Sequence, residues 1–226
     1  MANLITGVTS GTGGLSTTAD ASGQIALQTN NGTTALTLDT SQNATFAGTI
    51  NSGSITSTGT VSGATGTLYP LVASTAVNTT SGTSIDFTGI PSWVKRITIL
   101  FSNVSTSGSS PLLIQIGNGS VEITGYAGVG IGATGANTTS GVATVSTGFP
   151  TDANNQAAAA TSRNGTITIA LVTGTTYAYS SVISGNAYCT MVGATKTTSA
   201  IIDRVRITST VGTDTFDAGV INILYE

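Results

Sequence analysis

The sequence predicts an all-β protein in two segments: short strands over residues 1–66, then an antiparallel, jelly-roll-like β-sandwich over residues 67–226. Nearly a third of the residues are Ser or Thr, and 29 are Gly. Threonine favours strands, whereas Gly and Ser disfavour helices. Apolar and polar residues also alternate in several runs of strand length. Charged residues make up only 7% of the chain, against roughly 25% in an ordinary soluble domain, so hydroxyls and backbone groups must supply most of the polar surface.

The boundary between the segments is marked by a change of composition near residue 67. From Met1 to Gly66 there is no Lys, Arg, Pro, Trp or Tyr, and the only acids are Asp20 and Asp39. Every basic residue, all four Pro, the Trp and all six Tyr follow. Pro70 closes the junction.

Three strands are predicted in the first segment, at residues 25–29, 35–39 and 44–50. Asn30-Asn31-Gly32 predicts a hairpin turn between the first two, because Asn and Gly tolerate the positive φ that such turns need. Residues 41–43 predict the second turn. After Ile50 the pattern becomes Gly-spaced short runs that recur roughly every six residues.

The first segment is poor in large apolar residues. Their burial cannot offset the conformational entropy of ordering some fifty residues in an isolated chain. We therefore expect this segment to share a core with copies of itself, which would also remove exposed strand edges; a disordered linker is the alternative. Between Leu15 and Gly66 the large apolar residues are Leu15, Ile25, Leu27, Leu36, Leu38, Phe46, Ile50, Ile55 and Val61.

The second segment is long enough to enclose its own core. Alternating apolar residues predict strands separated by Gly- and Ser-containing turns, as in antiparallel sandwiches and jelly rolls. Residues 154–161 are the only place where a helix is conceivable, and a loop with one turn fits them better. The runs are Ile97, Ile99 and Phe101; Leu112, Ile114 and Ile116; Ile167, Ile169 and Leu171; Ile201, Asp203, Val205 and Ile207; and Ile221, Ile223 and Tyr225.

The charge pattern argues against two classes of partner. The formal net charge is −3, and the six Lys and Arg are scattered, so the basic patch that nucleic-acid binding needs is missing. No apolar run approaches the length of a membrane span. The N-terminus lacks the features of a secretory signal, so we expect synthesis in a cytoplasm. Cys189 is the only cysteine, and we expect it to be a small buried apolar residue.

The motifs of enzyme and cofactor sites are weak. Without His, a Ser-His-Asp or Cys-His site and a His-based metal site are impossible. Residues 130–135 match the dinucleotide fingerprint in letters only, because a polar run follows in place of the required helix. We expect a Gly-rich loop there and no cofactor. Residues 192–197 lack the Gly-Lys-Ser/Thr core of a phosphate loop, and no serine marks Lys95 or Lys196 as a Ser-Lys pair.

A few acids and tyrosines are candidates for catalysis, calcium binding or sugar binding. Glu122 and Asp152 are the one carboxylate pair worth testing for glycoside hydrolysis. Asp214 and Asp217 are expected in a turn, with Arg204 or Arg206 as candidate partners, rather than at a calcium site. Tyrosines suit sugar faces, but strand tyrosines are more often core or subunit contacts. We expect this of Tyr126, Tyr177, Tyr179 and Tyr188, so no receptor-binding residue is assigned.

Two parts of the sequence resemble a known class of proteins. ALTLDTSQNATFAGTI at residues 35–50, followed by SITSTGTV at residues 54–61, resembles the shaft segments of tail fibres and other virion fibres of tailed bacteriophages. DFTGIPSWVKRITILF at residues 86–101, with DRVRIT at 203–208 and DAGVINILYE at 217–226, is similar to a C-terminal β-domain of phage and prophage structural proteins.

The resemblance implies a homotrimeric structural protein of the virion, either tail-fibre-like or head-fibre-like. Its N-terminal segment would be an intertwined β shaft that anchors to other virion proteins, and its C-terminal β-sandwich would point outward for host adsorption. Host surface glycan is a candidate partner. The resemblance carries over no catalytic, cofactor-binding or metal-binding residue. The alternatives are a polysaccharide-binding or polysaccharide-cleaving module of a virion appendage and, disfavoured by the missing signal sequence, a bacterial surface protein.

Overall fold

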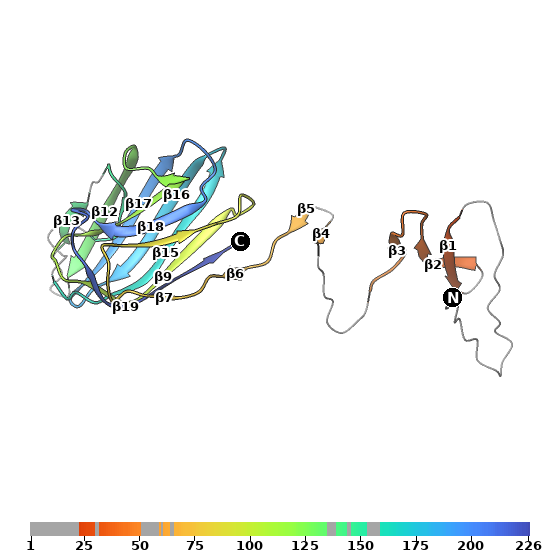
Figure 1. Ribbon diagram of the computed structural model, residues 1–226, viewed down its shortest axis with the longest axis horizontal. Coiled ribbons are helices and arrows are strands. Elements are labelled where there is room, and N and C mark those ends of the chain that lie inside the picture. The colour runs from red at the N-terminus through yellow and green to blue at the C-terminus, as the bar shows by residue number, and fades with distance from the viewer. Residues whose placement is uncertain are drawn as a thin grey trace. The chain divides into compact units, whose positions relative to one another are not determined.

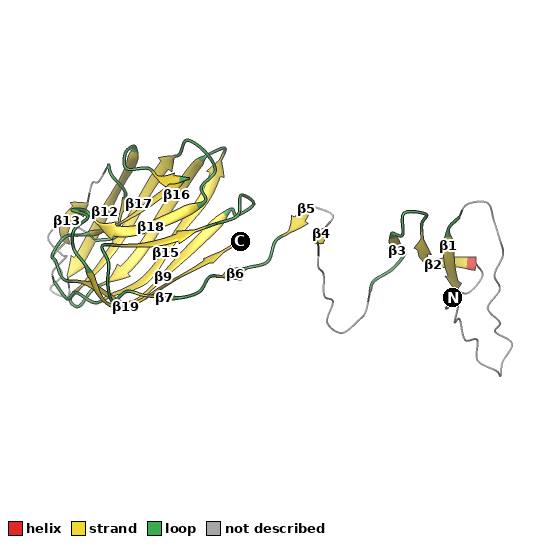
Figure 2. Ribbon diagram, in the orientation of Figure 1, coloured by secondary structure: helices red, strands yellow, loops and turns green. Residues whose placement is uncertain are grey.

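The computed structural model describes residues 23–29, 32–50, 59, 61–63, 66–134, 139–143, 146–152 and 159–226. These residues form antiparallel strands and connecting loops, and none of them is α-helical; the short helical segment that is red in Figure 2 is a 3₁₀ turn at Gly32. No helix in the described part of the chain could cross a membrane. The chain divides into two compact units, residues 1–59 and 60–226, whereas the composition changes near residue 67. The predicted all-β, antiparallel architecture is confirmed.

The N-terminal unit contains a three-stranded meander of β1 (Ile25–Thr29), β2 (Thr33–Leu38) and β3 (Ala44–Phe46), in the order β1-β2-β3 (Figure 1). All three predicted strands are present. The third ends at Phe46 rather than at Ile50.

The turns of this meander are formed by the predicted residues where the structure describes them. Gly32 precedes β2 with a φ of 77°, a conformation open to glycine; Asn30 and Asn31 lie outside the described residues. Between β2 and β3 the Asp39 carboxylate accepts hydrogen bonds from the backbone N–H groups of Ser41 and Asn43, both at 2.9 Å. This arrangement is an Asx-type turn. Of the Gly-spaced runs that follow, residues 51–58 lie outside the described part, and β4 (61–63) and β5 (66–68) form a hairpin.

The C-terminal unit contains a nine-stranded antiparallel sheet, the larger sheet. Its order is β13-β12-β17-β16-β15-β9-β19-β6, and β7 also pairs with β19. All of its pairings are antiparallel. The strands are β6 (Val72–Ala73), β7 (Val77–Asn78), β9 (Arg96–Thr106), β12 (Tyr126–Thr134), β13 (Thr139–Ala143), β15 (Arg163–Thr173), β16 (Thr176–Ser184), β17 (Tyr188–Thr197) and β19 (Phe216–Tyr225).

A five-stranded antiparallel sheet, the smaller sheet, packs against the larger one (Figure 1). Its order is β11-β10-β18-β8, and β14 also pairs with β10. The chain passes from one sheet to the other after β7, β8, β9, β11, β13, β14, β17 and β18. The strands are β8 (Ser84–Thr88), β10 (Leu112–Asn118), β11 (Ser120–Val121), β14 (Phe149–Pro150) and β18 (Arg204–Ser209).

The core lies between the two sheets and takes apolar side chains from both. Its aromatic centre is Phe149, which stacks on Tyr179 with ring centroids 4.5 Å apart and meets Tyr126 edge to face at 4.8 Å. The hydroxyl of Tyr179 donates to the Pro150 carbonyl, so its polar end is satisfied inside the core. Tyr177 is also buried, as expected.

Three local expectations are corrected. Cys189 is exposed, because in β17 it precedes Thr190, which points inward. Residues 130–134 of the fingerprint-like run lie in β12 and not in a loop; Gly135 is outside the described residues. Strand β10 is buried on both faces rather than alternately, because the side chain of Leu113 packs against Gly148 in the loop that precedes β14. The Ala-rich run at 154–161 lies mostly outside the described residues.

Candidate functional surfaces

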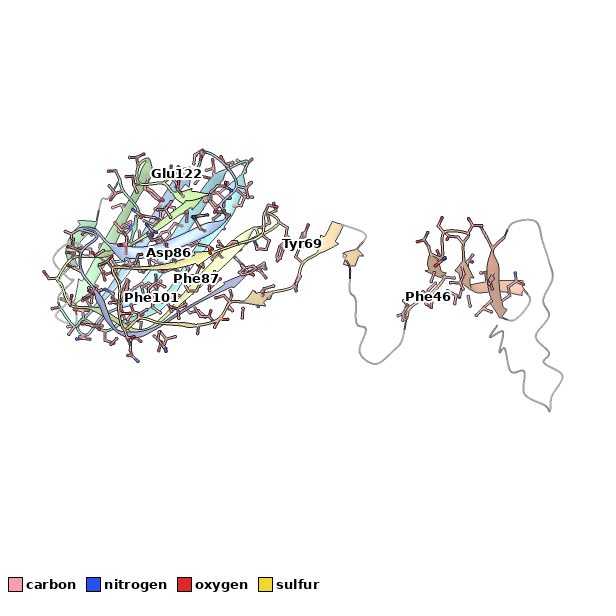
Figure 3. The ribbon with its side chains drawn as sticks, viewed as in Figure 1. Phe46, Tyr69, Asp86, Phe87, Phe101 and Glu122 are labelled. Carbon is pink, nitrogen blue, oxygen red and sulfur yellow. The ribbon has the colours of Figure 1, made fainter. Side chains whose placement is uncertain are left out.

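One face of the β1–β3 meander is apolar and exposed. Leu27 pairs with Leu36, and Leu36 pairs with Phe46, so these three side chains form a row on one face. Ile25 and Leu38 pair beside them and extend the same face. Yet Ile25 is 59% exposed, Leu27 45% and Phe46 49%. Phe46 is labelled in Figure 3. We call these five residues the meander face.

No described side chain of this unit shields the meander face from solvent. A sheet of three short strands needs its apolar face covered to be stable in water. The described part of the unit holds a single charged side chain, Asp39, which the β2–β3 turn uses. The meander face is therefore uncharged, and identical copies could approach one another without like-charge repulsion.

The larger sheet carries a second exposed apolar surface on its outward side. Ile131 of β12 pairs with Met191 of β17, and Met191 pairs with Val182 of β16, which makes a cross-strand row. Val129 lies beside this row, and all four side chains are about half exposed. A shallow hollow of about 380 Å³ is lined by three of them, Val129, Ile131 and Met191. We call these four residues the sheet patch.

Sequence reasoning missed the sheet patch, although the signal is visible in hindsight. Glycines alternate with apolar residues in β12, and the glycines occupy the positions on the inward face of the strand. Gly130 is buried because Val192 occupies the space of its missing side chain; a Cβ would lie 2.7 Å from Val192 Cγ2. The apolar residues are thus turned outward, the reverse of an ordinary half-buried strand.

Glu122, the first residue of the proposed acid pair, lies after β11 in an ionic network at one end of the sandwich (Figure 3). Its carboxylate accepts from Lys196 Nζ at 2.5 Å and from the N–H and Oγ of Ser199 at 2.7 and 2.8 Å. Partial burial alone would raise the pKa of Glu122, but these hydrogen bonds outweigh it and the pKa is lowered. Lys196 also lies over the ring of Tyr126, 5.4 Å from its centroid.

Asp152, the second acid, is completely buried after β14 and paired with the equally buried Arg163. Arg163 Nε lies 3.0 and 2.9 Å from the two carboxylate oxygens. The backbone N–H of Leu112, the hydroxyl of Thr151 and the hydroxyl of Tyr188 also donate to the carboxylate. Burial, reinforced by the charge of Asp152, raises the pKa of Tyr188. This carboxylate has its hydrogen-bonding capacity filled by the protein.

The two acids therefore belong to separate networks with no partner in common. A glycosidase pair needs both carboxyl groups to reach the substrate. Asp152 is closed off from solvent, so the arrangement does not present Glu122 and Asp152 together. In the described residues, neither Lys95 nor Lys196 hydrogen-bonds to a serine side chain through Nζ.

The prediction that Asp214 and Asp217 pair with Arg204 or Arg206 is wrong. Arg204 pairs with Asp203, and Arg206 pairs with Asp86, each at 2.7 Å. Asp214 instead accepts from the backbone N–H of Ser110. Asp217, placed in β19 rather than in the turn, accepts from the hydroxyl of Ser105. The described residues contain no group of three or more acidic or Cys side chains arranged to hold a metal ion.

No family model, no curated protein and no solved structure matches this chain.

Proposed function

We propose that the protein is a structural, non-enzymatic component of a tailed-phage virion: a homotrimeric fibre or fibre-like decoration that presents a β-domain for adsorption to the host surface. The observation that supports the proposal best is the exposed, uncharged meander face. An apolar face of this kind needs a partner surface, and in a symmetric assembly the partner is the same face of another copy.

Three copies fit this requirement. Three sheets, each with one apolar side, can form the walls of a prism and enclose one core, which leaves none of the apolar sides in water. The resemblance of residues 35–50 and 54–61 to fibre shafts favours this count over a dimer. In this assembly residues 1–66 are the shaft and the attachment to other virion proteins, and residues 67–226 are the head.

The strand order supports a jelly-roll head. The smaller sheet contains the neighbours β8, β18, β10 and β14, and the larger sheet contains β9 beside β15 and β12 beside β13. These are the neighbours of a jelly roll of two four-stranded sheets, with the β16–β17 hairpin inserted between β15 and β12 and β19 added beyond β9. The sheet patch lies on the inserted hairpin and β12, and we assign it to contacts between heads.

The mass in solution tests the shaft. We expect the full chain to have three times the chain mass, and a chain starting at Leu68 to associate more weakly. Phe46→Ser, on the meander face, should lower the mass of the full chain at micromolar concentration. Thr45→Ser, on the opposite face of the same strand, is the matched control and should leave the trimer intact.

A monomeric full chain would refute the proposal, and so would a Phe46→Ser chain with the same mass as the Thr45→Ser chain. The placement in a virion has its own test, which is mass spectrometry of purified phage particles. The protein should be present at a multiple of three copies per particle. Its absence from the particles would refute the placement in a virion, while the oligomeric state would still be tested by the mass in solution.

A further inference from the structure

The outward side of the smaller sheet is hollowed into a groove of about 350 Å³. Two cross-strand rows form its floor, because residues paired across strands point the same way. The floor and walls combine three distant parts of the sequence. One row is Ser84, Thr208 and Leu113, and the next is Arg206 and Gln115, with Asp86 paired to Arg206 just outside the groove. The walls include Ile123, Thr147 and the turn at residues 209–212.

The one charged side chain of the floor, Arg206, is held in place and neutralised by Asp86, which lies beside the groove. Arg206 donates to both oxygens of Asp86, at 2.7 and 3.1 Å (Figure 3 shows Asp86). This bidentate pair fixes the plane of the guanidinium. No described residue accepts from Nη1 of Arg206, so its donors remain available at a side chain that is 39% exposed.

The amide of Gln115 is also fixed, although it is almost fully buried. Its Nε2 donates to the carbonyl of Thr147 at 3.0 Å, which determines which way the amide is turned. No described residue donates to its Oε1. The floor therefore offers a fixed donor at Arg206 and a fixed acceptor at Gln115, which are directly paired on the adjacent strands β18 and β10.

The rim of the groove is partly apolar. Ile123 and Val211 are 60% and 57% exposed, and both line the groove. Small-molecule sites combine a few oriented polar groups with apolar walls, typically over about 300–1,000 Å³. The volume here is at the lower end of that range and suits one or two rings of a ligand.

We propose that this groove binds a neutral saccharide unit. A sugar hydroxyl both donates and accepts, so a pair of neighbouring hydroxyls matches an Arg donor beside an amide acceptor. The C–H faces of the ring match the apolar rim. An anion is disfavoured because the charge of Arg206 is already balanced by Asp86. The inference rests on the proposed function in one respect only. In a trimer, three linked grooves would bind a surface with several sugars more tightly than one groove does, because the first contact raises the effective concentration for the others.

The test uses the full chain and four probes in ligand-observed NMR titrations: methyl glucoside, methyl galactoside, methyl mannoside and methyl N-acetylglucosaminide. We expect at least one of them to bind with a millimolar dissociation constant. Arg206→Gln should weaken that binding about tenfold, the effect expected for loss of a charge-assisted hydrogen bond. Val211→Ala should weaken it several-fold, whereas the control Val172→Ala, equally exposed on β15, should bind like the parent.

The proposal is overturned if none of the four glycosides binds, or if Arg206→Gln and Val211→Ala bind as well as the parent. Binding of inorganic phosphate or glucuronate alone would overturn it in favour of an anion site. Because Val211 is exposed, its variant tests the groove even if Arg206→Gln unfolds. The oligomer mass of each variant separates the two proposals, since sugar binding by a monomer would uphold the groove and refute the trimer.

Discussion

Asp152→Asn should strongly destabilise the fold without touching a catalytic group. The substitution keeps the shape of the side chain but removes its charge. Arg163 then remains fully buried without a counter-ion. The new amide also turns an NH₂ group toward donors that the carboxylate accepts from, which include the N–H of Leu112 and the hydroxyl of Tyr188.

The size of the loss follows from the burial of the pair. Both side chains have no exposed surface, so solvent screening does not reduce their interaction. Removing one member of a buried ion pair typically costs about 3–5 kcal/mol. We expect the free energy of unfolding to fall by about that amount in Asp152→Asn. Replacing both members together, as in Asp152→Leu with Arg163→Met, should recover only part of the loss: no charge is then left unpaired, but the N–H of Leu112 and the hydroxyl of Tyr188 lose their acceptor.

Urea denaturation followed by tryptophan fluorescence measures this loss, with all variants at one chain concentration because the stability of an oligomer depends on it. Asp203→Asn is the control. It breaks the exposed pair with Arg204, and such pairs contribute roughly 0–1 kcal/mol. A loss below about 1 kcal/mol in Asp152→Asn would show that the pair contributes no more than a surface one, and the reasoning would be wrong.

Three further predictions follow from single positions. In Gly165→Ala the new Cβ would lie 2.1 Å from the Val182 carbonyl oxygen at a φ of 148°, so we expect urea midpoints to show a loss of about 2–4 kcal/mol; Gly193→Ala, which meets nothing within 4 Å, should be nearly neutral. Because the pKa of Glu122 is lowered in the fold from 4.5, the ionised carboxylate stabilises the protein above that pH. This contribution is lost as the pH falls through the folded pKa, and Glu122→Gln should flatten the acid limb of stability against pH. Cys189 is exposed and should react with a thiol reagent in the native protein; protection until unfolding would contradict its placement.

Much of the secondary structure was predictable from local pattern. The alternation of Ile97, Ile99 and Phe101 predicts β9, and the three residues are buried in the core as expected. The Asp39 turn was predictable from turn residues at 41–43. These features depend on neighbours in sequence, because a strand shows its buried face as a period of two.

Side-chain partners were harder to predict. Sequence spacing predicts Asp214 or Asp217 as the partner of Arg206. Arg206 instead pairs with Asp86, 120 residues away, because β8 and β18 are adjacent strands. Cys189 was expected inside on the basis of residue type, but strand register placed it outside. Sequence spacing and residue type do not contain the register of distant strands.

The sequence alone determined that the chain is all-β, that its first segment is short of apolar residues, and that no histidine chemistry is possible. Only the tertiary structure decided that Asp152 is sealed inside an ion pair, that apolar residues of β12 and β17 face outward, and that Gln115 and Arg206 meet in one groove. The physical reason is that composition and alternation act within a strand, whereas burial and side-chain contacts depend on which strands become neighbours.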